Sequence, residues 1–259
     1  MASVDGAVAP TAEATIPLKD DGLYRGDGAF EVIRLYAGRP FALTEHLDRL
    51  ERSAASVEMT VDRASFEPEI EALLERYGPH DGLLRLIATR GGRRIAVTEP
   101  PIEHAPAVRL ATVEFSPTVI LNGVKSLSYA ANMQATRLAK ARGADEAVLV
   151  TPDEIVLEAP TSTLFWVSPQ GMLRTTTLAA GVLDSITRRP LIEALDIEEG
   201  EWPVADLRAA EEAFLASTTR EVQPVSEIDG RDLGDTPGPR TTEAQEAFRA
   251  ALERELGSS

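Results

Sequence analysis

The sequence contains no cysteine, which excludes disulfide bonds and thiolate metal ligands. Histidine is nearly as scarce, and His46, His80 and His104 lie far apart, so we expect no histidine-rich metal site. No segment approaches the roughly 20 consecutive apolar residues that a helix needs to cross a bilayer. The first residues lack the basic start and apolar core of a signal peptide. Together these absences predict a cytoplasmic protein without a metal site.

The sequence also contains far fewer positively than negatively charged residues. The 26 lysine and arginine residues face 42 aspartate and glutamate residues, which gives a formal net charge of −16. Such a charge repels nucleic-acid phosphates and anionic lipids, so we expect neither nucleic acid nor a membrane as a partner. Hydrophobic residues make up 43% of the 259 residues, enough for a core that contains a pocket. The composition therefore favours a soluble globular protein that acts on small molecules.

Only three of the 26 cationic residues are lysines, and Lys125 lies in an unusual setting. Lys19 and Lys140 lie among charged residues, whereas Lys125 follows an apolar, strand-like segment at residues 119–124. A lysine carried into the interior by such a strand has a lowered pKa, because burial disfavours its charged form. The neutral amine can then attack an aldehyde and hold it as a Schiff base. The alternative is a lysine that extends to solvent from the end of the strand.

The apolar pattern of the first half predicts strands, then helices, then strands. This order is typical of an α+β domain rather than of repeated βαβ units. We expect strands at residues 29–36, 41–43, 83–89 and 107–114, a helix capped by Thr44 that extends to about Val57, and a second helix capped by Asp62.

A linker at residues 116–124 divides the chain into two predicted domains, residues 1–115 and residues 125–259. The second half predicts short strands between three helices, the first of which ends at Gly143, where glycine suits a left-handed conformation. We expect these helices at residues 132–142, 184–195 and 241–256, and strands near residues 146–150, 154–157, 163–167, 172–175, 213–217 and 222–228.

A series of short segments extends over most of the chain, from about Asp20 to Phe248. These segments are Gly26–Arg34, His46–Leu50, Lys125–Tyr129, Gly143–Ala147, Leu157–Glu158, Ser185–Arg188 and Ser217–Val225. In this order they resemble the fold-type IV enzymes that depend on pyridoxal 5′-phosphate. That family includes branched-chain aminotransferases, D-amino acid aminotransferases and aminodeoxychorismate lyase. A single segment such as Gly-Asp-Gly indicates only a turn, whereas the ordered series is specific.

The resemblance implies a fold class and an assembly. It implies an α+β fold of two domains: a small α/β N-terminal domain and a larger C-terminal pseudo-barrel that binds pyridoxal 5′-phosphate. In this family the cofactor lies at the domain interface, and the enzymes are homodimers. We therefore expect a homodimer here as well.

The resemblance also assigns the residues that carry the chemistry. It implies that Lys125 is the catalytic residue, which holds the cofactor aldehyde and moves a proton between the substrate α-carbon and the cofactor. Glu158 lies in an apolar segment, where a carboxylate needs a partner, and the resemblance makes the pyridine nitrogen that partner. The alternative for Glu158 is a surface residue at the end of a strand.

Further residues are expected to bind the cofactor. The resemblance implies that Arg49 binds the phosphate of the cofactor with its planar guanidinium. Hydroxyl groups and backbone N–H groups then donate further hydrogen bonds to the same phosphate. Tyr129 is expected to bond the ring hydroxyl of the cofactor. The alternatives are a solvated helix arginine, hydroxyls that only cap helices or turns, and a core tyrosine. The expected cofactor-binding residues are Arg49, Lys125, Tyr129, Glu158, Ile186, Thr187, Ser217 and Thr218.

The substrate-binding residues are expected to be Phe30, Arg90 and Thr219. Arg90 belongs to a basic loop, residues 89–94, and the alternative is a solvated basic turn. Two positions depart from the family pattern: Ser185 replaces a glycine and Thr163 replaces an asparagine. Both positions shape the pocket and neither carries the covalent chemistry. The two departures therefore affect the prediction of the substrate class more than the prediction of cofactor binding.

The resemblance implies transfer of an amino group between an amino acid, of the D-amino acid or branched-chain type, and a 2-keto acid. One alternative is an aminodeoxychorismate lyase that releases pyruvate and 4-aminobenzoate, since it shares the cofactor residues and the stretch Thr89-Arg90-Gly91. The other is a homologue that binds the cofactor without catalysis, which the intact Lys125 and Glu158 disfavour.

Overall fold

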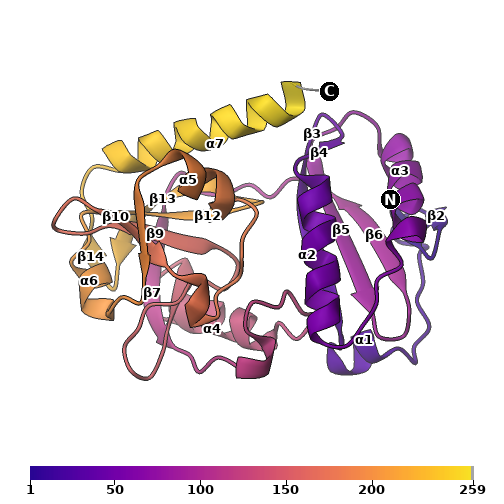
Figure 1. Ribbon diagram of the computed structural model, residues 1–259, viewed down its shortest axis with the longest axis horizontal. Helices are drawn as coiled ribbons and strands as arrows, with labels where there is room; N and C mark the ends of the chain where they lie inside the picture. The colour runs from indigo at the N-terminus through magenta and orange to yellow at the C-terminus, as the bar shows by residue number, and fades with distance from the viewer. Residues whose placement is uncertain (258–259) are drawn as a thin grey trace. The chain divides into compact units, whose positions relative to one another are not determined.

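A computed structural model describes residues 1–257, and these residues form two compact units (Figure 1). Unit 1 contains Met1–Ile102 together with Val124–Tyr129. Unit 2 contains Glu103–Gly123 together with Ala130–Gly257. Each unit combines its own sheet with helices, which confirms the predicted α+β class.

Unit 1 is built on a six-stranded antiparallel sheet with the strand order β2-β1-β6-β5-β3-β4. Its longest pair runs from Gly28 opposite Thr89 to Leu35 opposite Gly82. The strands are β1 (Ala2–Val4), β2 (Ala7–Ala9), β3 (Gly28–Tyr36), β4 (Arg39–Pro40), β5 (Gly82–Thr89) and β6 (Arg94–Glu99).

Three helices complete unit 1: α1 (Asp21–Arg25), α2 (Leu43–Ser56) and α3 (Arg63–Tyr77). Leu47, Leu50 and Ala54 lie on one face of α2 and are buried in the core that also contains Ile33 of β3. The Asp62 carboxylate caps α3 by accepting from the Ser65 N–H at 3.2 Å, as predicted.

The predicted cap of α2 was wrong. The helix begins at Leu43, one residue before Thr44, and its N-cap is Ala42. Ala42 has φ 53° and offers no side-chain acceptor. Thr44 therefore lies inside the first turn, where its backbone is already helical.

Unit 2 is built on an eight-stranded mixed sheet with the order β11-β10-β9-β12-β13-β7-β8, to which β14 adds beside β13. β7 pairs in parallel with β8 and β13, and β10 pairs in parallel with β11. The strands are β7 (Val108–Glu114), β8 (Glu146–Val150), β9 (Thr163–Val167), β10 (Leu173–Thr176), β11 (Ile197–Gly200), β12 (Glu212–Ser217), β13 (Glu221–Ile228) and β14 (Arg231–Asp232).

Short helices and two longer ones surround this sheet. Among the described residues, no helix is both long and apolar enough to cross a membrane. The helices of unit 2 are η1 (Val119–Leu121), α4 (Ala130–Ala141), η2 (Leu178–Ala180), α5 (Arg188–Ala194), α6 (Val204–Arg208) and α7 (Pro239–Gly257).

Several elements differ from the sequence-based expectation. The return strand expected at residues 41–43 is β4 at Arg39–Pro40, and residues 154–157 make only isolated β-bridges at Ile155 and Val156. The apolar segment before Lys125 is not a strand: it forms η1, where Val119 and Ile120 are 77% and 83% exposed. The helix expected from residue 184 begins only at Arg188. Pro190 explains the later start, because a proline fits the first turn of a helix but clashes deeper inside one.

The two units are also divided differently from the predicted domains. Residues 103–123 belong to unit 2, because β7 pairs with β8 and β13 there. The segment Val124–Tyr129 belongs to unit 1, where the Leu127 N–H donates to the Gly28 carbonyl at 2.9 Å. Lys125 is therefore held by the sheet of the N-terminal unit.

Candidate active site

Lys125 is fixed in unit 1 through its backbone. Its N–H donates to the Ser53 hydroxyl of α2 at 3.1 Å, and its carbonyl accepts from the Phe30 N–H of β3 at 3.1 Å. The side chain is half-buried, whereas Lys19 and Lys140 are exposed. The scarcity of lysine and its local sequence therefore singled out a lysine whose backbone the fold fixes. An irregular segment carries it, in which Ser126 makes an isolated β-bridge to Ala29 of β3.

Two aromatic rings surround the Lys125 amine. Its Nζ lies 4.4 Å from the centre of the Phe30 ring and 5.8 Å from that of Tyr129. The two rings meet edge to face with their centres 5.3 Å apart. Rings in these positions shield the amine from water and attract its charged form weakly. The structure thus brings together three residues expected at the site: Phe30, Lys125 and Tyr129.

A buried triad that the sequence did not reveal lies in the same unit. The fully buried Glu31 carboxylate accepts from Arg49 Nε and Nη2, each at 2.7 Å, and lies 2.7 Å from His46 Nδ1. Burial raises the pKa of Glu31, but the charge of Arg49 and the hydrogen bonds of both partners outweigh it and lower the pKa to about 2. Glu31 is therefore ionised at neutral pH.

The protonation of His46 follows from this carboxylate. Burial lowers the pKa of His46 below 6.5, and Arg49 and Lys125 add to the effect, although Glu31 opposes it. A carboxylate only accepts, so the neutral imidazole carries its proton on Nδ1 and donates it to Glu31. Arg49 and Ser53 lie four residues apart on one face of α2, so the same helix face holds the triad and the Lys125 backbone.

Arg90 is committed to contacts within unit 1. Its Nε donates to the Asp27 carboxylate at 2.5 Å, and its two Nη atoms donate to the carbonyls of Val57 and Glu58. In the same loop, Arg93 pairs with Asp5, and Arg94 pairs with Glu69. These bonds use three of the five N–H donors of the Arg90 guanidinium and fix its position, so a substrate carboxylate could reach only the two that remain.

Unit 2 holds the other expected residues. The half-buried Glu158 accepts from the Leu183 N–H through Oε1 at 3.0 Å, which orients its carboxylate. Ile186 and Thr187 are buried just before α5, and the Thr187 side chain makes no capping bond to that helix. Plain helix capping therefore does not account for the Thr187 hydroxyl.

Buried hydroxyls without a partner gather at one end of this sheet. Among the described residues, four buried side-chain hydroxyls have no hydrogen-bond partner, and three of them are Ser162, Thr163 and Ser217. Thr163 of β9 lies opposite Ala216 of β12, the residue before Ser217. A buried hydroxyl without a partner costs about 1–3 kcal/mol. This end of the sheet therefore suits a polar ligand that bonds to the hydroxyls.

A buried polar network supports the turn that follows Ser217. Arg220 Nη2 pairs with Glu146 of β8 at 3.1 Å, and the side chains are 12% and 5% exposed. Burial lowers the pKa of Arg220, which Glu146 partly offsets. Gln223 accepts from Arg220 and donates to the Ala105 carbonyl at 2.7 Å. Glu146, the first residue of the apolar strand β8, was the only local sequence signal for this network.

The same turn carries Thr218 and Thr219, both half-buried. The Thr219 hydroxyl lies 3.3 Å from His104 Nε2, a residue that the sequence did not link to the site. The expected residues therefore fall into two groups. Phe30, Arg49, Lys125 and Tyr129 gather in unit 1, with Arg90 bound to its own partners there, and Glu158, Ile186, Thr187, Ser217, Thr218 and Thr219 belong to unit 2.

Comparisons with known proteins agree on one family. The family described as amino-transferase class IV matches residues 28–228. A Methanocaldococcus jannaschii protein, provisionally named a branched-chain-amino-acid aminotransferase, is 33% identical over 95% of this chain and 94% of its own. The D-alanine aminotransferase of Bacillus licheniformis is 29% identical over 96% and 95%. A hypothetical aminotransferase from Mycobacterium tuberculosis, solved with alpha-ketoglutarate and PMP, is 26% identical with a TM-score of 0.88 over 97% and 98%.

Proposed function

The chain belongs to the class IV aminotransferase family, and on that premise we propose that it is a pyridoxal-phosphate-dependent transaminase. It moves an amino group between an amino acid, of the D-amino acid or branched-chain type, and a 2-keto acid. The observation that carries the proposal is Lys125, the lysine that the fold pins by its backbone and places beside Phe30 and Tyr129. The similar M. tuberculosis structure, which contains alpha-ketoglutarate and PMP, supports a keto acid as the second substrate.

The residues present fit pyridoxal 5′-phosphate. This cofactor needs an amine for its aldehyde, a carboxylate for its pyridine nitrogen, and hydrogen-bond donors for its phosphate. Lys125 offers the amine, Glu158 the carboxylate, and Ser217 a buried hydroxyl without a partner among the described residues. We propose that Thr218, Ile186 and Thr187 add donors for the phosphate, and that Arg49 does so from unit 1.

When bound, the cofactor supplies an electron sink that stabilises negative charge on the substrate α-carbon. The Lys125 amine, in its neutral form, would take the proton from that carbon and deliver it to the former aldehyde carbon of the cofactor. Phe30 and Tyr129 keep water away from this amine. Glu158, oriented by the Leu183 N–H, would hold a proton on the pyridine nitrogen. We propose that Phe30 and Thr219 contact the substrate.

A spectral cycle tests the transaminase proposal. The purified protein, loaded with pyridoxal 5′-phosphate, is mixed with D-alanine, L-leucine or L-glutamate in turn. A productive donor converts the cofactor to its pyridoxamine form, and pyruvate or 2-oxoglutarate then restores the original absorbance. The donor that drives the cycle also decides between D-amino acid and branched-chain activity, because relatives of both kinds match the chain.

The lyase alternative is not favoured, since the similar proteins are aminotransferases. Release of pyruvate and 4-aminobenzoate from aminodeoxychorismate, without any spectral cycle, would support the lyase instead. A protein that binds the cofactor and turns over neither class of substrate would be a non-catalytic homologue.

We propose that the protein acts as a homodimer. An exposed apolar segment in unit 1 supports this: Leu18, Leu23 and Tyr24 are 75%, 53% and 58% exposed. Light scattering is expected to give twice the chain mass of 27.9 kDa, and Leu23→Asp is expected to lower that mass. A wild-type protein of a single chain mass would contradict the proposal. The cytoplasmic location stays a prediction.

A further inference from the structure

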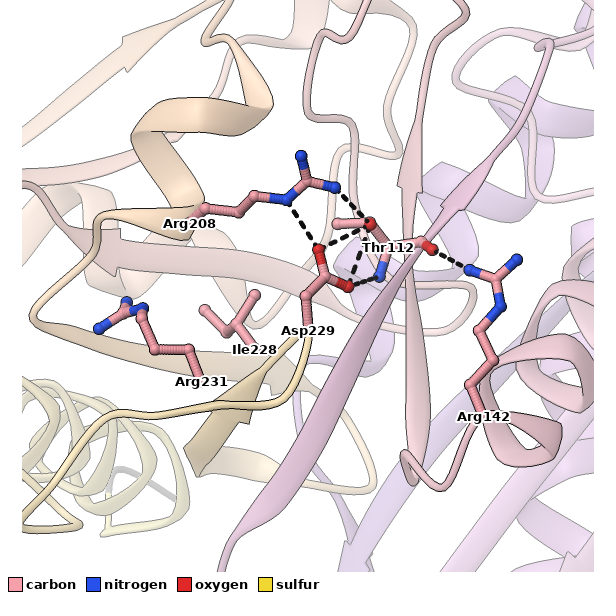
Figure 2. A pocket seen from close by; sticks show the side chains of 6 residues that line it. All are labelled: Thr112, Arg142, Arg208, Ile228, Asp229 and Arg231. Atoms are coloured by element: carbon pink, nitrogen blue, oxygen red, sulfur yellow. Dashed lines mark hydrogen bonds and ion pairs between the residues drawn. The ribbon is translucent and has the colours of Figure 1, made fainter.

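Unit 2 contains a cavity that none of the proposed catalytic or cofactor-binding residues line (Figure 2). Its volume is about 450 Å³, within the range of roughly 300–1,000 Å³ that is usual for small-molecule sites. The lining residues are Thr112, Arg142, Arg208, Ile228, Asp229 and Arg231. Three guanidiniums and one carboxylate give this lining a net charge of +2, whereas the whole chain carries −16.

The cavity opens where two parallel strands separate. β13 pairs with β7 up to Ile228, which lies opposite Leu110. Beyond this point the Asp229 side chain takes over the pairing, because its carboxylate accepts from the Thr112 N–H at 2.7 Å. β7 then continues to Glu114 beside β8. Thr112 of β7 and Asp229, which meet at this point, both line the cavity.

The arginines are held in place from three different elements. Arg208, at the end of α6, donates through Nε to Asp229 at 2.9 Å and through Nη2 to the Thr112 hydroxyl at 3.2 Å. Arg142, just after α4, donates through Nη1 to the Thr112 carbonyl at 2.9 Å. Arg231 of β14 donates through Nη2 to the Ala210 carbonyl at 2.5 Å. Each guanidinium is therefore anchored before any ligand arrives.

Many donors remain after these anchors are counted. A guanidinium has five N–H hydrogens. Within residues 1–257, Arg208 uses only two of them, and Arg142 and Arg231 use one each. Anchored guanidiniums lose little side-chain entropy on binding, and their flat donor arrays match the oxygen pairs of phosphate and carboxylate groups. Arg142 and Arg231 lie at opposite ends of the opening, with Ile228 and Asp229 between them, and Arg208 lies beside Asp229 (Figure 2).

We propose that this cavity is a second ligand site, which binds the phosphate or carboxylate group of a small anion at Arg208, while Arg142 and Arg231 attract the anion from the two ends of the opening. Asp229 has two opposite effects there. Its bonds to Thr112 and Arg208 shape the cavity, while its negative charge repels the anion and occupies part of Arg208. The site therefore predicts variants whose effects on anion binding differ in sign.

The test is calorimetric titration of the protein loaded with pyridoxal 5′-phosphate, so that the proposed cofactor site is filled. Inorganic phosphate is titrated in one series and succinate in the other, at constant ionic strength. Saturable binding of one molecule per chain is expected, and the tighter of the two probes identifies the ligand group. Neither probe requires turnover, so the result does not depend on whether the protein is a transaminase.

Four variants make the test specific. Arg142→Gln and Arg231→Gln are each expected to weaken binding by about threefold, because each removes a positive charge from the lining of the cavity. Asp229→Asn keeps an acceptor for the Thr112 N–H but removes the negative charge, so binding is expected to tighten by a similar factor. Arg137→Gln, on exposed α4 and bonded to Gln134, is the control and is expected to change nothing.

The outcomes that would overturn the site are equally specific. The first is that neither probe binds saturably. The second is that Arg137→Gln weakens binding as much as Arg142→Gln does. The third is that Asp229→Asn binds the probe more weakly although its thermal unfolding matches that of the wild type. If Asp229→Asn proves unstable, the two arginine variants still decide, since both side chains belong to exposed residues.

Discussion

Replacing Glu31 with glutamine perturbs the buried triad at a single atom. The Glu31 and Arg49 side chains are 0% and 6% exposed, so solvent hardly screens their attraction. Glutamine keeps the shape of the side chain, but it leaves the Arg49 guanidinium buried without a counterion. Removing one partner of a buried ion pair costs about 3–5 kcal/mol. The variant is therefore expected to lose stability on that scale at neutral pH.

The pKa of Glu31 gives the same magnitude by another route. Burial alone would raise the pKa, but Arg49 and His46 lower it from 4.5 to about 2. At 1.36 kcal/mol for each pH unit, this difference corresponds to about 3 kcal/mol of stability. Because the folded-state pKa is the lower one, the contribution is complete above pH 4.5. It is lost as the pH falls through about 2.

Urea unfolding followed by circular dichroism measures the effect. Glu31→Gln is expected to lower the free energy of unfolding by about 3–5 kcal/mol at pH 7, and the difference from wild type is expected to shrink by more than half at pH 3. Glu67→Gln is the control: Glu67 pairs with Arg63 but its side chain is 45% exposed, so its loss is expected to stay below about 1 kcal/mol. A loss below about 1 kcal/mol for Glu31→Gln at pH 7, or an equal loss at both pH values, would refute the reasoning.

Three further variants test the residues of unit 2. Ser217→Ala removes a buried hydroxyl without a partner, so the free energy of unfolding of the cofactor-free protein in urea is expected to stay within about 1 kcal/mol of wild type. Absorbance titration is expected to show several-fold weaker binding of pyridoxal 5′-phosphate, and an unchanged affinity would contradict the role. Arg220→Gln leaves Glu146 buried without a counterion and is expected to cost about 3 kcal/mol, with a smaller loss for Arg220→Lys, and equal losses would contradict an electrostatic role. Glu158→Gln is expected to keep the cofactor bound but to lose most turnover, and stopped-flow half-reaction rates near wild type would assign the pyridine proton to another group.

Local patterns were enough to find the residues whose own surroundings are unusual. Lys125 stood out because lysine is rare and its neighbours are apolar. The helix faces of α2 and α3 followed from apolar spacing, and Asp62 was identified as a cap because such side chains prefer that position. These features depend on residues a few positions apart, which the sequence displays directly.

Features that depend on distant partners were missed. Glu31 and Arg49 pair across 18 positions and Glu146 and Arg220 across 74, so no local pattern links them. Glu31 also lies on β3, where the consecutive residues from Gly28 to Glu31 are all buried. The strand therefore lacks the alternation of buried and exposed residues that would have shown on which side Glu31 lies. The basic loop at residues 89–94 looked ready for a ligand because its partners Asp5 and Glu69 come from other elements. The apolar segment 119–121 suggested a strand, although it is an exposed 3-10 helix.

The central claim is that Lys125 holds pyridoxal 5′-phosphate, and reduction with borohydride tests it most directly. The reagent adds hydride across the carbon–nitrogen double bond between an amine and the cofactor aldehyde, which makes the link permanent. Peptide mapping by mass spectrometry is then expected to place one phosphopyridoxyl group on Lys125. Modification of Lys19 or Lys140 instead, or of no lysine at all, would contradict the account.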